Sequence, residues 1–291
     1  MRLPRFEYFA PKTLEDALNL LAEQGEGAHV MAGGTDIVVK MNHGRLKPKA
    51  IVALEGIDEL DHIHFHAIDG LTIGATARLA DVASHPDVLN HYPALAEAIL
   101  TMANVEVRNM GTVVGNLCNA APSADCAPPL IVMGAQVVLS RLNGERSLPL
   151  DQFFKGPGLT AMEPGEVLTS ISVPVLPDGA AASYKRISGR CGVDIAAVGV
   201  GAMVTFDGDV CKEARIVLGA VAPIPMRATK TEDLLQGRQW TPDLIEKAGQ
   251  EASEESKPIS DVRASAQWRK AMVAVLTRRV LQEAQARATR S

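Results

Sequence analysis

The sequence predicts an α+β protein built from more than one domain. Its 291 residues exceed the ~150 residues of a typical single domain. Helix-spaced and strand-like segments are mixed along the chain, and a stretch rich in proline, glycine and alanine at 174–182 (PVLPDGAAA) indicates a linker. A composition of 47% hydrophobic and 22% charged residues is that of an ordinary soluble globular protein.

The composition argues against two classes of partner. A net charge of -5 and an aromatic content of 4% give no support for nucleic-acid binding. The chain has no run of ~18 apolar residues, so no membrane span is predicted. The N-terminus (MRLPRFEYFAPKT) lacks the apolar core of a signal peptide, so a cytoplasmic protein is expected.

The first sixty residues predict an α-β-α-β unit. Thr13 is the expected cap of its first helix, with Asp16 three residues on, and leucine and alanine recur at helical spacing as far as Leu21. The other expected elements are a strand at 29–31, a helix beginning at 37–41 and a strand at 50–54.

Hairpins become more frequent after this unit. Asp69-Gly70 predicts a turn between strands at 64–68 and 71–74, and Asn143-Gly144 a type I′ turn after a strand at 135–142. Thr76 is expected to cap a short helix that reaches Val82. The other expected elements are a helix at 93–102, a helix or turn from 127 and a strand at 166–173.

The last third of the chain predicts a second α+β unit. Strands at 196–206 and 214–220 flank the turn signal Asp207-Gly208. Thr231 is expected to cap a short helix, and Pro242 to begin another. A long helix is predicted at 266–286.

No metal site is predicted. The cysteines, Cys118, Cys126, Cys191 and Cys211, include no CxxC pair and are expected to be reduced structural thiols. His62, His64 and His66 would share one face of a strand, but no cysteine or carboxylate pattern supports them as ligands.

Two glycine-containing segments carry the functional signal. The first, AGGTD at 32–36, follows a predicted strand, and the second, MGTVVGNLCNAAPSADCAPP at 110–129, is rich in small residues. Successive backbone N–H groups in such turns can bind an anion. Neither segment matches the dinucleotide GxGxxG pattern or a P-loop. Taken alone, the second segment is equally compatible with a buried connection packed under a sheet.

The two segments together predict more than either does. A long dinucleotide could be held at its diphosphate from both sides by such a pair. Asp125, at the end of the second segment, could then accept hydrogen bonds from ribose or ribityl hydroxyls.

These residues, in combination, resemble the FAD-binding medium subunit of the molybdenum hydroxylases, the family of xanthine dehydrogenase and carbon monoxide dehydrogenase. The resemblance covers essentially the whole chain. It rests on AGGTD at 32–36, TVVGN at 112–116 and APSAD at 121–125. Further matches are VRN at 107–109, FKGPG at 154–158 and RAS at 263–265.

The resemblance implies the domain organisation. Residues 1–176 would form a two-part FAD-binding domain of the vanillyl-alcohol-oxidase (PCMH) type, with subdomains at about 1–60 and 61–176. Residues 180–288 would form a smaller α+β domain similar to the C-terminal domain of carbon monoxide dehydrogenase flavoprotein.

It also implies the cofactor contacts. The two glycine segments would wrap the FAD diphosphate, and Asp125 would bind adenosine hydroxyls. Asp194 and Ile195 would lie in a loop close to the flavin ring and control access to it. No catalytic or metal-binding residue is implied, and a covalent link to FAD is not expected, since the first segment has no histidine. The implied cofactor-binding residues are Ala32, Gly33, Gly34, Thr35, Asp36, Met102, Thr112, Val113, Val114, Gly115, Asn116, Asp125, Leu168 and Lys185.

The implied function is that of an electron-transfer subunit. Electrons would come from a molybdopterin-binding large subunit through [2Fe–2S] clusters on a small subunit, reach FAD on this chain, and pass to NAD⁺ or another acceptor. The sequences of 116–119 (NLCN) and 156–158 (GPG) most resemble those of the xanthine dehydrogenase branch. They favour a heterotrimer that acts on a purine or related N-heterocycle. The long C-terminal helix and the segment from Cys191 to Asp194 are the expected partner contacts.

Two alternatives remain open at this point. One is a self-contained flavin oxidoreductase of the same fold, which would need an acid or base facing its substrate. The other is a non-catalytic nucleotide-binding scaffold subunit. A purified chain that stays colourless with added FAD would favour the scaffold.

Overall fold

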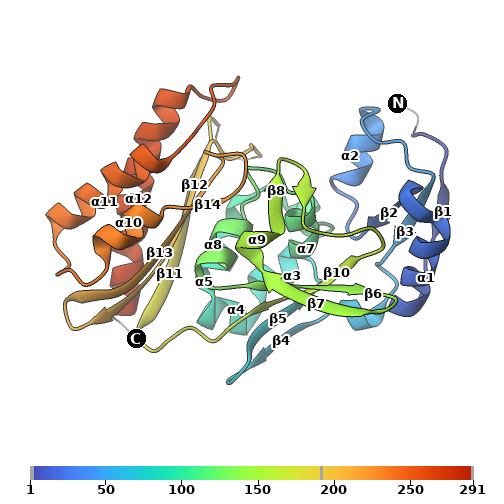
Figure 1. Cartoon of the computed structure of the whole chain (residues 1–291), viewed down its shortest axis with the longest axis horizontal. Helices are drawn as coiled ribbons and strands as arrows, with labels where there is room; N and C mark the ends of the chain where they lie inside the picture. Colours follow the sequence, from blue (N-terminus) through green and yellow to red (C-terminus); the bar gives the residue numbers. More distant parts are fainter. Residues whose placement is uncertain (1–2, 191–192, 290–291) are drawn as a thin grey trace.

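The computed structural model describes residues 3–190 and 193–289. Its strands form three main sheets, one after another along the chain (Figure 1). The first is a parallel sheet with the order β1-β3-β2, in which β3 (Ala50–Ala53) is central and buried between β1 (Glu7–Phe9) and β2 (Ala28–Met31). Its helices are α1 (Leu14–Gln24) and α2 (Ile37–Asn42).

The second sheet is antiparallel, with the order β4-β5-β10-β6-β7. A small hairpin of β8 (Phe154–Gly156) and β9 (Leu159–Thr160) follows the short helix α9 (Leu150–Phe153). The strands of the sheet are β4 (Ile63–His66), β5 (Gly70–Gly74), β6 (Gln136–Arg141), β7 (Gly144–Pro149) and β10 (Val167–Val173). Its helices are α3 (Leu79–Ser84), α4 (Pro86–His91), α5 (Pro93–Thr101), α6 (Val105–Arg108), α7 (Val113–Cys118) and α8 (Ala127–Val132).

The third sheet is also antiparallel, and it lies between two groups of helices (Figure 1). Helix α12 (Ala266–Ala288) packs on β11 and β12, with α11 (Pro242–Glu255) against it, while α8 and α5 of the preceding unit contact the sheet from the other side. The remaining elements are β11 (Ala180–Ile187), β12 (Val198–Asp207), β13 (Val210–Gly219), β14 (Met226–Arg227) and α10 (Thr229–Leu235).

Glycine on β12 allows the third sheet to approach α8 closely. An added Cβ on Gly201 would lie only 3.0 Å from the carbonyl of Pro128, at the start of α8. The Ala220 N–H also donates to the Pro122 carbonyl oxygen at 2.7 Å, so the third sheet is hydrogen-bonded to the second glycine segment. This packing places the C-terminal unit beside the loops that carry the functional signal.

Several local expectations are wrong in detail. Thr76 caps no helix, since α3 begins after Arg78 and the Thr76 hydroxyl is buried without a hydrogen-bond partner. The residue before α10 is Ala228, and the Thr231 hydroxyl instead donates to Glu255 at 2.7 Å. Leu142 and Asn143, not Asn143-Gly144, connect β6 and β7. The expected linker ends earlier, because β11 already begins at Ala180.

The expected helix cap and the long last helix are confirmed. Thr13 Oγ1 accepts the Asp16 N–H at 3.1 Å, and α12 covers 266–288. Among the helices of the described residues, none combines the length and the apolar character needed to cross a bilayer.

Arg269 fixes the segment that leads into α12. Its side chain is 3% exposed and donates to the carbonyl oxygens of Ala197 and Ala220 at 2.8 and 2.9 Å and to Asp261 at 2.7 Å. Asp261 also accepts the Arg263 N–H at 2.8 Å. The backbone hydrogen bond from Arg263, followed by the bonds from Arg269 and the Arg263 side chain, lowers the pKa of Asp261 from 3.8 to about 2.

We predict that this network makes the fold sensitive to acid. Since the folded-state pKa of Asp261 is depressed, its contribution to stability is present above pH 3.8 and is lost as the pH falls toward about 2. Asp261→Asn should therefore lower the free energy of unfolding near neutral pH. Its free energy of unfolding should also fall less than that of the wild type between pH 3.8 and about 2. Unfolding free energies measured from pH 5 to pH 2 test this. Parallel profiles for the wild type and the variant would contradict it.

Candidate functional site: a cavity between two glycine segments

The two glycine segments are in direct backbone contact. An added Cβ on Gly33 would lie 1.7 Å from the carbonyl oxygen of Met110 and 2.8 Å from the Gly111 Cα. No residue with a side chain fits at position 33 unless the two segments separate. Gly34 has a φ of 74°, which favours glycine at this position. The sequence therefore allows a close approach that any larger residue at Gly33 would prevent.

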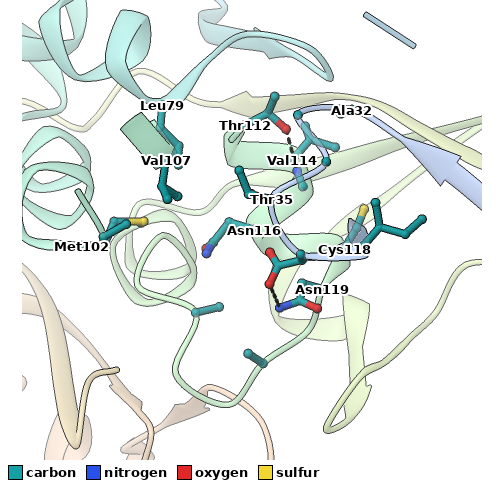
Figure 2. A pocket seen from close by; sticks show the side chains of 18 of the residues that line it. Ala32, Thr35, Leu79, Met102, Val107, Thr112, Val114, Asn116, Cys118 and Asn119 are labelled. Atoms are coloured by element: carbon teal, nitrogen blue, oxygen red, sulfur yellow. Dashed lines mark hydrogen bonds between the residues drawn. The ribbon is translucent and has the colours of Figure 1, made fainter. Parts of the chain in front are cut away.

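The second segment continues directly into helix α7. Thr112 precedes the helix, and its Oγ1 accepts the Gly115 N–H at 2.9 Å (Figure 2). The first segment likewise leads into α2, which begins at Ile37. First-turn N–H groups of a helix have no acceptor within the helix and carry partial positive charge. Each glycine segment therefore ends at the start of a short helix.

A hydrogen bond also joins the segments at the other end of α7. Asn119 follows the helix, and its Nδ2 donates to Asp36 Oδ1 at 3.0 Å (Figure 2). Burial raises the pKa of Asp36, and the nearby Lys40 partly opposes this shift. The first segment thus contacts the second both before and after α7.

Around these segments lies a cavity of about 1290 Å³. This exceeds the ~300–1,000 Å³ typical of small-molecule sites and suits an extended ligand. Every residue implied by the family resemblance lines it except Val113, which is buried in the core, and Lys185. The implied residues that line the cavity are Ala32, Gly33, Gly34, Thr35, Asp36, Met102, Thr112, Val114, Gly115, Asn116, Asp125, Leu168, Asp194 and Ile195.

One wall of the cavity follows the end of α5. Met102, Leu79 and Val107 face the interior together (Figure 2). The chain turns sharply after Met102, since Ala103 has a φ of 50°. Arg108 Nη1 donates to the Met102 carbonyl oxygen at 2.7 Å and holds this turn. Residues with a positive φ that are not glycine cluster at functional sites.

Asp125 lines the cavity, but its carboxylate already has two protein partners. The Tyr184 hydroxyl donates to Oδ1 at 2.6 Å, and Arg186 Nη1 donates to Oδ2 at 2.8 Å. Burial raises the pKa of Asp125, against the lowering effects of Arg186 and Tyr184. The carboxylate therefore also joins the second segment to strand β11.

Strand alternation separates the two basic residues of β11. Arg186 is nearly buried and lines the cavity, whereas Lys185 points away and pairs with Glu283 of α12. Successive residues of a strand face opposite sides. The sequence analysis named Lys185, which does not line the cavity, and did not name Arg186, which does. The twofold periodicity of the strand was a signal that could have separated the two.

The far rim of the cavity belongs to the C-terminal unit. Asp194 Oδ2 accepts the Arg190 N–H at 3.1 Å, and its Oδ1 accepts the Ile195 N–H at 2.9 Å. The rim exposes apolar side chains, with Val262 fully exposed and Val193 61% exposed. Cys191, part of the expected partner contact, lies outside the described residues.

Two cysteines lie at or beside the cavity. Burial raises the pKa of Cys118 to about 12 and that of Cys126 well above its ordinary value, so both are neutral thiols. Within the described ranges, no group of three or more metal-binding side chains comes together. His62 and His64 do share a strand face, and their rings stack at 5.2 Å.

Comparison with known families accounts for this arrangement. Residues 4–176 match the model of the FAD binding domain in molybdopterin dehydrogenase, and residues 182–284 match that of the carbon monoxide dehydrogenase flavoprotein C-terminal domain.

Relatives match over nearly their full length. The glyceraldehyde dehydrogenase medium chain of Sulfolobus acidocaldarius is 32% identical over 96% of this chain and 98% of its own. A putative xanthine dehydrogenase FAD-binding subunit of Escherichia coli is 30% identical over 97% of this chain and 96% of its own.

Solved structures agree in fold. A chain of carbon monoxide dehydrogenase from Hydrogenophaga pseudoflava superposes with a TM-score of 0.94 at 33% identity, covering 99% of each chain. A chain of quinoline 2-oxidoreductase from Pseudomonas putida 86 gives 0.93 at 29% identity, again over 99% of each. With both family models matched in order along one chain, this protein belongs to the family of FAD-binding medium subunits of the molybdenum hydroxylases.

Proposed function

We propose that this chain is the FAD-carrying electron-transfer subunit of a multi-subunit molybdenum hydroxylase. The observation that carries the proposal is the cavity of about 1290 Å³ between two glycine segments in backbone contact. Its lining includes the backbone of both segments and almost no bulky side chain between them. Such a site suits the diphosphate of a dinucleotide held without a covalent bond.

The residues present fit FAD at this place. An added Cβ on Gly115 would meet only the Thr112 Oγ1, at 3.0 Å, so the space beyond Gly115 is open to a ligand. The segments 32–36 and 112–116 would hold the diphosphate, while Met102 and Leu168 would lie beside the cofactor. When bound, FAD supplies the redox chemistry of the subunit, and the protein orients and tunes it.

The polar groups of the cofactor would meet the C-terminal side of the cavity. Each carboxylate oxygen can accept more than one hydrogen bond, so Asp125 can still accept from an adenosine hydroxyl. In place of Lys185 we assign the cationic contact to Arg186, which lines the cavity. Asp194 and Ile195 form the rim through which an acceptor would approach.

Substrate oxidation would occur on partner subunits, one binding molybdopterin and one binding [2Fe–2S] clusters. The relatives named as medium chains of carbon monoxide and glyceraldehyde dehydrogenases are themselves parts of larger enzymes. We propose NAD⁺ or another electron acceptor, a heterotrimeric enzyme and a cytoplasmic location.

For the substrate of the whole enzyme we propose a nitrogen heterocycle such as a purine. Several relatives are named for xanthine, nicotinate or nicotine. Other relatives are named for glyceraldehyde and carbon monoxide, so aldehydes and carbon monoxide belong in the same substrate screen.

The first of two predictions from the proposed function separates the roles of Gly33 and Gly115. Gly115→Val should abolish FAD binding, because its side chain would enter the cavity, while the stability of the apoprotein falls less than in a Gly33 variant, since the added Cβ would press only on the Thr112 Oγ1. Gly33→Ala should also lower the stability of the apoprotein, by about 3 kcal/mol, since its Cβ would collide with the Met110 backbone. Flavin absorbance after gel filtration and thermal melting of the apoprotein measure the two effects.

A third variant serves as the control. Gly208→Ala lies in the β12–β13 turn, where an added Cβ meets nothing within 4 Å, and the strain of its φ of 58° is confined to that turn. It should keep full flavin occupancy. Full occupancy in Gly115→Val, or a wild-type chain that stays colourless with added FAD, would sink the proposed function.

The second prediction concerns the isolated subunit. Loaded with FAD, it should show no turnover with xanthine, nicotinate or an aldehyde, because substrate oxidation is assigned to the partner subunits. After chemical reduction it should pass electrons to NAD⁺ or to an artificial dye, as followed by flavin absorbance. Turnover of any of these substrates by the isolated chain would favour the self-contained oxidoreductase instead.

A further inference from the structure

Asp36 stands where a helix cap is expected but does not act as one. Aspartate before a helix commonly accepts the N–H of the second or third helical residue. Asp36 precedes α2, makes no such bond, and has helical backbone angles of -98° and -44°. Its Oδ1 instead accepts a hydrogen bond from Asn119, 83 residues away in sequence, at 3.0 Å.

Asn119 lies at the opposite end of α7 from the Gly33 contact. The six residues of α7 span about 9 Å at 1.5 Å per residue. Gly33 touches Met110 and Gly111 before this helix, and Asp36 bonds to Asn119 after it. Helix α7 is anchored in the core by its own buried side chains, Val113, Val114 and Leu117. The two contacts at its ends therefore fix the position and direction of the first segment along the helix.

We propose that Asp36 is a positioning residue, which acts through Asn119 to hold α7 and the second segment against the first. This inference rests on the proposed FAD site, and it changes the expected role of Asp36 from a cofactor contact to a clasp between the segments. The clasp needs a hydrogen-bond acceptor at position 36 and a donor at position 119. It does not need a negative charge, which would face the cofactor diphosphate.

Alanine variants test the coupling. Asp36→Ala and Asn119→Ala should each weaken FAD binding by about tenfold, the order expected for a hydrogen bond to a charged group. The double variant should bind no more weakly than either single variant, because the two residues act as one unit. Asp36→Asn should bind close to wild type, since the carbonyl oxygen of the introduced amide can still accept from Asn119.

An exchange of the two residues gives the sharpest test. Asn119→Asp alone brings two carboxylates together and should weaken FAD binding further than Asn119→Ala does. Adding Asp36→Asn reverses the direction of the hydrogen bond and should restore binding to within about threefold of wild type. Asn90→Asp, on an exposed position of α4, is the matched control for an added carboxylate and should bind as wild type does.

Dissociation constants are measured from the quenching of FAD fluorescence. The visible circular dichroism of bound flavin reports the protein environment of the flavin ring. Thermal melting of each apoprotein checks that the variant folds. The same melting temperatures give a double-mutant cycle for stability, beside the one for FAD affinity. Loss of affinity in Asp36→Ala but not in Asn119→Ala, or failure of the exchange to restore it, would overturn the clasp. A wild-type chain that does not bind FAD would refute the proposed function. The clasp would still be tested by the melting temperatures of the wild type, Asp36→Ala, Asn119→Ala and the double variant: if the shifts of the two single variants add up in the double variant, the clasp is refuted as well.

Discussion

The backbone contact of Gly33 with Met110 and Gly111 holds the site together. It joins the small parallel sheet to the larger antiparallel unit, and each contributes one wall of the cavity. Because the contact is between main chains, it depends on the absence of a side chain at one residue. A cavity made in this way is lined by the small residues of both segments, and such loops suit a phosphate-bearing ligand.

The C-terminal unit completes the cavity through a second set of interactions. Glycine on β12 lets the third sheet approach Pro128 closely, which brings β11 alongside the second segment. Asp125 then meets Tyr184 and Arg186. Removing either Asp125 or Arg186 would leave the other as an unpaired buried charge, which destabilises a fold. The apolar rim of Val193 and Val262 remains exposed on the same side.

This architecture suits the proposed role, in which the chain holds a cofactor and substrate oxidation occurs on partner subunits. Its side chains position a cofactor, and the buried thiols stay neutral. The precision required is therefore geometric: the two segments must keep their spacing, and the rim must leave a path to the cofactor. Asp36 with Asn119, and Arg108 with the Met102 carbonyl, are hydrogen bonds that serve this purpose from opposite walls.

Sequence patterns alone were enough to predict the α+β class, the family, the two glycine segments and most local elements. Thr13 as a cap, the β4–β5 and β12–β13 hairpins and the long last helix follow from interactions within a few residues, which a sequence pattern records directly. The tertiary structure decided which groups meet across long separations. The steric requirement for glycine at position 33, the choice of Arg186 over Lys185, and the partners of Asp36 and Asp125 all depend on segments brought together by folding. A pattern in one stretch of chain cannot encode where a distant carbonyl or amide will lie.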